Sequence, residues 1–289
     1  MSSRPKPNRT LIRHAPAQSA VRRPERSLRA AGIVRLFAAC LGAIALATQA
    51  SAAASTGPID LELYGRLLAK HTRVVDDLAG TRVDYASLKA SQDWKRLTRQ
   101  VHAANPAGLS RNAKLAFWIN AYNILTIDLI VQHYPIDGIK DIGSFFFPVW
   151  NIEVATIAGH PLSLGAIEND ILRKMGEPLI HGAIVCASAS CPPLARTPFR
   201  PEHLSEDLSA AMRSWLSNPK KGAALDRRAK VLRLSKVFDW FESDFEARGG
   251  VLKVIAEFLP PQDASWIRVH RSDLSIRYFD YDWSLNGLR

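Results

Sequence analysis

One long segment with almost no polar face constrains the fold more than any other feature. Between Ser110 and Pro135, large apolar side chains recur at spacings that cover nearly the whole circumference of a helix. Ser110 is expected to cap the first turn, and Pro135 to end the helix. A helix that is apolar all round belongs at the centre of a core. The apolar residues of this segment are Leu115, Phe117, Trp118, Ile119, Tyr122, Ile124, Leu125, Ile127, Leu129 and Ile130.

The remaining pattern predicts further helices and a few short strands. Apolar residues at helical spacing predict helices over residues 59–72, 94–103, 163–172, 202–216, 238–247 and 251–258. Short strands are predicted over residues 152–157, 183–186, 231–234 and 275–281, with a turn at 158–160. Strands and helices do not alternate regularly. We therefore predict an α+β fold, with one domain over residues 59–289, mostly helices around the central apolar helix and a small, short-stranded sheet.

The N-terminal segment has the three parts of an export signal. Residues 1–35 are basic, residues 36–47 form an uncharged apolar run, and small residues follow at 50–52. An apolar run of this length is too short for a permanent membrane anchor, since a spanning helix needs about 20 residues. We therefore expect residues 1–52 to be a cleavable secretory signal with a long basic leader, and the protein to be periplasmic or secreted.

The net charge of +11 is concentrated in this leader. Residues 1–35 hold nine basic side chains against Glu25, which leaves a net charge of +3 for the rest of the chain. A charge of that size provides no basic surface for nucleic acid. The expected partner is therefore a substrate or another protein, of a kind that the sequence does not identify.

Two cysteines flank a loop of small residues at positions 186–191. A predicted buried strand delivers Cys186, Cys191 precedes the Pro192-Pro193 pair, and His181 lies just upstream. Three interpretations remain open. Cys191 can be a nucleophile activated by His181, the two cysteines can form a disulfide, or the two thiols and the imidazole can bind a metal, although their spacing matches no familiar zinc site.

Two amides and one acidic segment are further candidates. Asn120 and Asn123 share a face of the central helix, where they are expected to hold a neighbouring loop by its backbone or to contact substrate. Residues 278–286 alternate aromatic and acidic side chains, which predicts a final half-buried strand. Either Asp282 or Asn286 orients an imidazole from this strand, or the strand closes the core with its acids in solvent.

Several ordered motifs resemble the domain of unknown function 547 family. The resemblance covers residues 59–286, and it implies an exported bacterial protein of a family with no assigned activity, which also occurs in plant proteins with a leucine-zipper region. Many members have histidine where this chain has Asn169, so chemistry that needs that imidazole would be missing here. The motifs are FWINAYN at 117–123, IE at 167–168 with ILR at 171–173, HGAIVCASASCPP at 181–193, VFDWF at 237–241 with DF at 244–245, and YDWSLN at 281–286.

Two functions are carried forward from the residues. The first is a thiol-dependent hydrolase or acyl transferase, with Cys191 as nucleophile, His181 as base and Asp282 as the orienting group. The alternative is a non-catalytic binding module, stabilised by a Cys186–Cys191 disulfide, that presents the aromatic residues 145–150 to a partner. The sequence identifies no cofactor or metal for either function, and it leaves open whether the protein is an enzyme.

Overall fold

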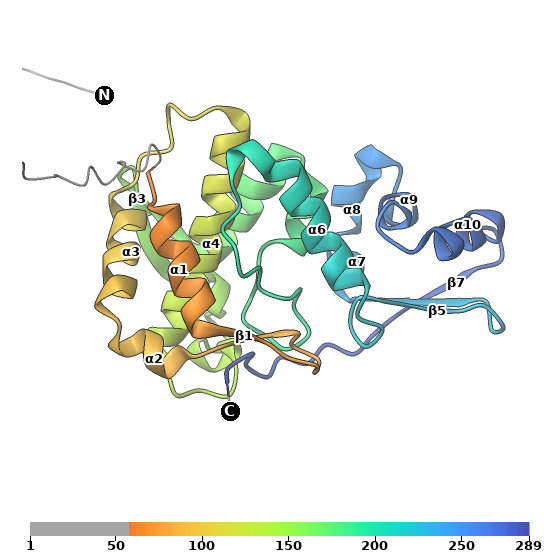
Figure 1. The fold of residues 1–289 in the computed structure, drawn as a ribbon, viewed down its shortest axis with the longest axis horizontal. Coiled ribbons are helices and arrows are strands. Elements are labelled where there is room, and N and C mark those ends of the chain that lie inside the picture. The colour runs from red at the N-terminus through yellow and green to blue at the C-terminus, as the bar shows by residue number, and fades with distance from the viewer. Residues whose placement is uncertain (1–57, 289) are drawn as a thin grey trace, which may run out of the picture. The chain divides into compact units, whose positions relative to one another are not determined.

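The apolar segment forms helix α4, Arg111–His133, in a computed structural model that describes residues 58–288 (Figure 1). Ser110 caps this helix by accepting a hydrogen bond from the Ala113 amide, as predicted. All ten predicted apolar residues are buried. Among the described residues, α4 alone is long and apolar enough to cross a membrane, and 89% of its most apolar stretch is buried inside the protein. It is the core helix of the domain. The leader predicted over residues 1–52 lies outside the described residues.

Helices surround α4 and extend away from it. Helices α2 and α3 pack directly on α4, α1 packs on α3, and the α8–α10 region lies at the opposite end of the domain in Figure 1. The helices besides α4 are α1 (Leu61–His71), α2 (Tyr85–Ala90), α3 (Gln92–Ala103), α5 (Leu164–Ala166), α6 (Leu204–Leu216), α7 (Val237–Trp240), α8 (Glu242–Phe245), α9 (Val251–Ala256) and α10 (Pro261–Val269).

The strands are short and form three small sheets. Strands β1 and β2 pair antiparallel, as do β3 and β4, while β6 pairs antiparallel with β5 and parallel with β7. The α+β class is therefore confirmed. The strands are β1 (Thr72–Val74), β2 (Thr81–Val83), β3 (Glu153–Ile157), β4 (His160–Ser163), β5 (Ala223–Asp226), β6 (Val231–Leu234) and β7 (Ser275–Tyr278).

The helix predicted over residues 163–172 is present but is not a regular α-helix. Ser163 caps it by accepting a hydrogen bond from the Ala166 amide. After the single turn of α5, residues Ile167–Leu172 form a π-helical segment, and Arg173–Met175 form a 3-10 turn. A π-helical turn widens the backbone and is often found at functional sites.

The strand predicted over residues 183–186 is absent, and this prediction was wrong. The 3-10 helix Pro178–Gly182 precedes this segment, which then runs without a strand partner. The side chain of Asn123 takes the place of a partner strand: its Nδ2 donates to the Ala183 carbonyl at 2.9 Å, and its Oδ1 accepts from the Val185 amide at 2.9 Å. Asn120 binds the backbone of Phe199 in the same way, at 2.8 and 3.0 Å. The prediction that these amides hold neighbouring backbone is confirmed.

Two other predicted elements differ from the structure. The helix expected over residues 238–247 is divided into α7, α8 and the 3-10 turn Glu246–Arg248. The last predicted strand ends with β7 at Tyr278, and the chain beyond it forms only isolated bridges, among them Ser188 with Leu285. This extended segment returns toward β1 and α2 at the end of the chain (Figure 1).

Replacing Asn123 with Ala will lower the free energy of unfolding by about 2 kcal/mol. The substitution leaves a buried amide and a buried carbonyl without partners, and each costs about 1–3 kcal/mol before the structure relaxes. Urea denaturation followed by circular dichroism measures the change. Asn112→Ala, at an exposed position of the same helix, is the matched control and should change stability by less than about 0.5 kcal/mol. Equal effects of the two substitutions would contradict the role given to Asn123.

Candidate functional site

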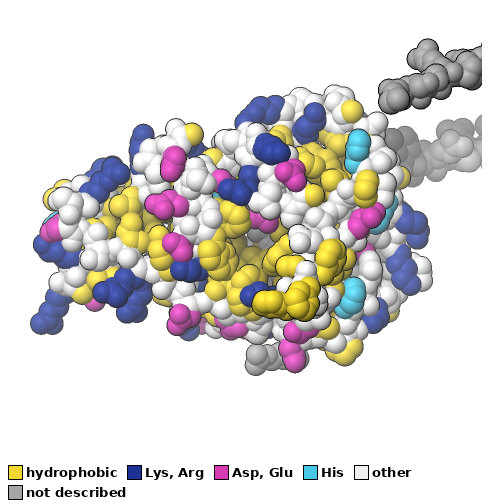
Figure 2. Space-filling model, turned by 180° about the vertical axis from the view of Figure 1, so that it is seen from behind, with side chains coloured by type: hydrophobic (Ala, Val, Ile, Leu, Met, Phe, Trp, Pro, Cys, Tyr) yellow, Lys and Arg dark blue, Asp and Glu magenta, His cyan; other side chains and the backbone are white. Residues whose placement is uncertain are grey.

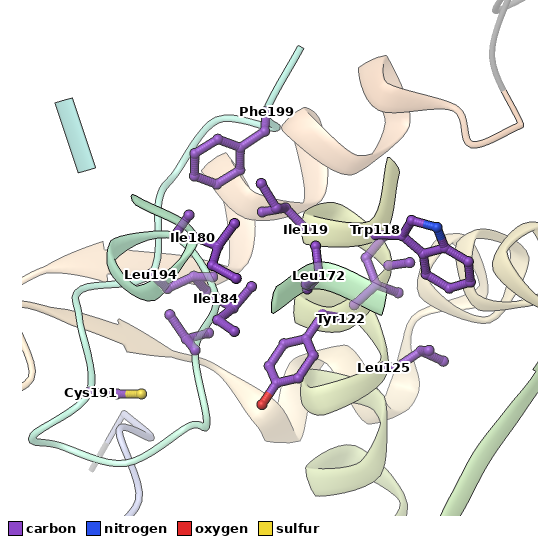
Figure 3. Close-up of a cluster of buried hydrophobic side chains, with 14 of the residues drawn as sticks. Trp118, Ile119, Tyr122, Leu125, Leu172, Ile180, Ile184, Cys191, Leu194 and Phe199 are labelled. Atoms are coloured by element: carbon purple, nitrogen blue, oxygen red, sulfur yellow. The ribbon is translucent and has the colours of Figure 1, made fainter. Parts of the chain in front are cut away.

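A pocket of about 240 Å³ lies where the π-helical segment, the 186–191 loop and the C-terminal segment meet. Figure 3 shows Cys191 at the edge of the buried apolar cluster formed by α4 and its neighbours. Figure 2 shows hydrophobic side chains gathered around a hollow on this face of the protein. The residues that line the pocket are Tyr122, Trp150, Gly165, Glu168, Asn169, His181, Ile184, Cys186, Cys191, Pro192, Val237, Trp240, Phe241, Tyr281 and Trp283.

The two cysteines lie side by side as thiols at the pocket. Their sulfur atoms are 2.9 Å apart, Cys186 is partly exposed, and Cys191 is buried. The Cys186 sulfur also lies 3.0 Å from the Ser188 hydroxyl and 3.3 Å from the Tyr281 hydroxyl. The next residue, Ala187, has a φ of 62°, a left-handed conformation that costs free energy for a residue with a side chain. This sharp turn holds Cys186 toward a ring of hydrogen-bond donors.

These contacts make Cys186 the more acidic of the two thiols. Burial alone would raise the pKa of Cys186, but hydrogen bonds from Cys191, Ser188 and Tyr281 outweigh it and lower the pKa to about 6. Burial and the neighbouring Cys186 raise the pKa of Cys191 well above its ordinary value. The sequence suggested Cys191 as the nucleophile. The directions of the two pKa shifts instead favour Cys186 as the thiolate, with Cys191 as a donor to it.

His181 is oriented by the carboxylate of Asp244. The Nε2 atom of His181 lies 2.7 Å from Oδ2 of Asp244, and the imidazole stacks on Phe241 with 4.4 Å between ring centroids. Arg173 donates to both carboxylate oxygens of Asp244 at 2.7 Å. Such a bidentate pair fixes the carboxylate, and through it the imidazole.

Asp282, the predicted orienting group, occupies a different position. Its carboxylate accepts a hydrogen bond from the Ser284 amide, and its own amide donates to the Ser190 hydroxyl. Its carbonyl accepts from the Ser190 amide, so its backbone supports the thiol loop. Asp244 takes the place expected of Asp282 beside His181. Asp244 is 63 residues from His181 in the sequence, and nothing in their spacing indicated the contact.

Glu168 adds a second carboxyl group to the pocket. Its Oε2 accepts a hydrogen bond from the Tyr122 hydroxyl at 3.2 Å. Burial raises the pKa of Glu168 above its ordinary value, and the nearby His181 only partly offsets this effect. Asn169, the next residue, accepts a hydrogen bond from Arg173 at 2.8 Å. In residues 58–288, no cluster of three or more His, Cys, Asp or Glu side chains is arranged to hold a metal ion.

The thiol loop is held from behind by a buried ammonium group. Lys221 is 1% exposed, and its Nζ donates to the carbonyls of Ala79, Ala189 and Cys191 at 2.8, 3.1 and 2.6 Å. Burial lowers the pKa of Lys221 to about 8. Lys221 therefore connects the loop that carries Cys191 to the β1–β2 hairpin.

Replacing Lys221 with Met will lower the free energy of unfolding by about 2 kcal/mol, because three buried carbonyls lose their donor. It will also slow alkylation of Cys186, because the loop that carries Cys191 loses its support. Urea denaturation and alkylation rates measure the two effects. Lys220→Met, at the exposed neighbouring position, should leave both unchanged. An unchanged alkylation rate in Lys221→Met would contradict the role of Lys221 in supporting the thiol site.

The fold and the pocket define an α+β protein with an acidic thiol and a carboxylate-bound imidazole at the surface of a helical core. Residues 106–216 match the family described as "Protein of unknown function, DUF547". The matched residues include Glu168, His181 and both cysteines, while Asp244 lies beyond them. No curated protein and no solved structure matches the chain.

Proposed function

We propose that the protein is a thiol-dependent hydrolase or acyl transferase with Cys186 as its nucleophile. The observation that carries the proposal is the Cys186 sulfur, which lines a pocket shared with His181 and lies within 3.3 Å of three donor groups. A thiolate is the reactive form of cysteine, and it needs such donors to exist near neutral pH. We also propose, from the leader over residues 1–52, that the protein acts outside the cytoplasm.

In the proposed reaction, the Cys186 thiolate attacks the carbonyl carbon of an acyl donor. A carbon–sulfur bond forms, the bond to the leaving group breaks, and the leaving group takes a proton from His181. Water or a second acceptor then gives a proton to His181 and attacks the thioester, which releases the acyl product and restores the thiolate. Asp244 binds Nε2 of His181, which leaves Nδ1 as the ring atom for these proton transfers.

Intact-mass spectrometry after addition of 4-nitrophenyl acetate tests this function. We expect the wild type to gain one acetyl group on Cys186 and to release nitrophenol. Cys186→Ser should gain none, while Cys191→Ser should still be acylated, because a serine hydroxyl can donate to the thiolate in the same way. Acylation that survives in Cys186→Ser would refute the assignment.

The 2.9 Å separation of the two sulfurs favours a second candidate function, thiol–disulfide exchange. Here the Cys186 thiolate attacks a disulfide substrate, one substrate thiol leaves, and Cys191 then displaces the other and closes a Cys186–Cys191 disulfide. The two cysteines are reduced in the structure. Cys191→Ser separates the two functions, since it should abolish turnover of a disulfide substrate but not acyl transfer.

A further inference from the structure

Two phenylalanines next to the pocket are fully presented to solvent. Phe145 and Phe146 are 93% and 91% exposed, and their rings pack edge to face with 5.3 Å between centroids. The turn that carries them is ordered by the Ser144 amide, which donates to the Phe147 carbonyl, and by the Phe147 amide, which donates to the Ser144 hydroxyl. These rings contribute nothing to the core. A contiguous exposed apolar group of this kind is typical of a binding surface.

This Phe145–Phe146 tip is connected to the pocket on both sides. Before it in the chain, the Lys140 ammonium lies 3.6 Å from the ring centroid of Trp283, which lines the pocket. After it, Trp150 also lines the pocket, with its ring 6.3 Å from that of Trp283. The segment that carries the tip therefore begins and ends at the aromatic wall of the pocket.

The aromatic wall continues from Trp283 toward the thiols. Trp240 stacks on Trp283 with 5.8 Å between centroids, and Tyr281, whose hydroxyl contacts the Cys186 sulfur, lies 4.6 Å from Trp283. Figure 2 shows hydrophobic side chains continuing around the hollow on this face. An extended apolar group placed on this surface would have one end at the nucleophile and the other at the tip.

We propose that the acyl donor carries a long unbranched hydrocarbon chain, with its carbonyl carbon at Cys186 and its chain on the aromatic surface that ends at Phe145 and Phe146. This inference rests on the proposed acyl-transfer function. A hydrocarbon chain makes no hydrogen bonds. The tip fits such a ligand, because its one hydroxyl, that of Ser144, already accepts a hydrogen bond from the Phe147 amide. Burial of each methylene should strengthen binding by about fourfold.

A series of 4-nitrophenyl esters with acyl chains of two, four, eight and twelve carbons tests the substrate class. We expect kcat/KM of the wild type to rise with chain length, and the rise to be much shallower in the double variant Phe145→Ser/Phe146→Ser. Both side chains are exposed, so the variant should fold. Val269→Ser, at a remote position that is 77% exposed, is the control and should keep the wild-type profile. A flat profile in the wild type, or an equal slope in the double variant, would overturn the inference.

Binding of dodecanoate to Cys186→Ser, measured by tryptophan fluorescence, separates this inference from the proposed function. If the tip substitutions weaken dodecanoate binding to Cys186→Ser at least tenfold, while the wild type turns over no ester, the chain site is supported and acyl transfer is rejected. If the wild type turns over short esters and Cys186→Ser binds no dodecanoate, acyl transfer is supported and the chain site is rejected. Two results would assign the tip to another occupant and overturn the inference: co-sedimentation with phosphatidylcholine vesicles without dodecanoate binding, or a dimer that the tip substitutions dissociate.

Discussion

Iodoacetamide will label the native protein about 100-fold more slowly at pH 7 once Cys186 is replaced by Ser. With the pKa of Cys186 lowered to about 6, most of this thiol is ionised at neutral pH. Cys191 is buried, and burial raises its pKa, so it should react more slowly than an ordinary thiol. Only the thiolate reacts with the reagent. Labelling followed by peptide mass spectrometry assigns the rate to each cysteine.

The pH dependence of this labelling gives a second readout. In the wild type the rate should rise with pH through about 6 and then level off, whereas an ordinary thiol gains rate up to about pH 8.5. Cys191→Ser is the matched control: it should keep most of the labelling and show a midpoint somewhat above that of the wild type, because a serine hydroxyl is the only change in the donor set. A wild-type midpoint near 8.5 would contradict an activated Cys186.

Replacing Asp244 with Ala will lower the free energy of unfolding by roughly 3–5 kcal/mol at pH 7. The carboxylate is mostly buried, and its removal leaves the Arg173 guanidinium and the His181 imidazole without their partner. Asp239→Ala removes an aspartate from an exposed ion pair with Lys236 and should cost less than about 1 kcal/mol. Urea denaturation of the two variants measures the difference.

Acid should remove the effect of this substitution. Burial alone would raise the pKa of Asp244, but hydrogen bonds from His181 and Arg173 outweigh it and hold the pKa well below its usual range. A carboxylate whose pKa is lower in the folded than in the unfolded state stabilises the fold fully above the unfolded value of about 3.9, and loses this contribution as the pH falls below it. The stability difference between wild type and Asp244→Ala should therefore be constant from pH 7 to 5 and shrink below about pH 4. A difference that persists unchanged at pH 2.5 would contradict the ion pair.

Apolar spacing, helix caps and turn residues predicted the elements that depend on residues close together in the sequence. Helix α4 follows from its apolar circumference and from the cap at Ser110, and the β3–β4 turn follows from Ala158 and Gly159, both of which have positive φ. The 183–186 segment has the composition of a buried strand. Its backbone groups are paired by the side chain of Asn123 and not by a partner strand, and composition does not distinguish these two arrangements.

The candidate site depends on contacts that are distant in the sequence. The pattern of residues 181–191 indicates a chemical centre, because its cysteines and histidine lie together in the chain. Asp244 and Tyr281 join them only through the fold, at sequence separations of 63 and 95 residues from His181 and Cys186. A single sequence contains no signal for such pairs, so its pattern indicates Asp282 and not Asp244 as the orienting carboxylate.

The hydroxyl of Tyr281 beside Cys186 has a consequence for the order in which the molecule matures. Contacts between residues 95 positions apart require closure of a long loop, which is slow relative to the formation of helices. In an unfolded chain Cys186 is an ordinary thiol, only a few per cent ionised at pH 7. Most buried cysteines become less reactive as a protein folds, whereas this one should become more reactive, so that its chemistry is switched on by completion of the native state.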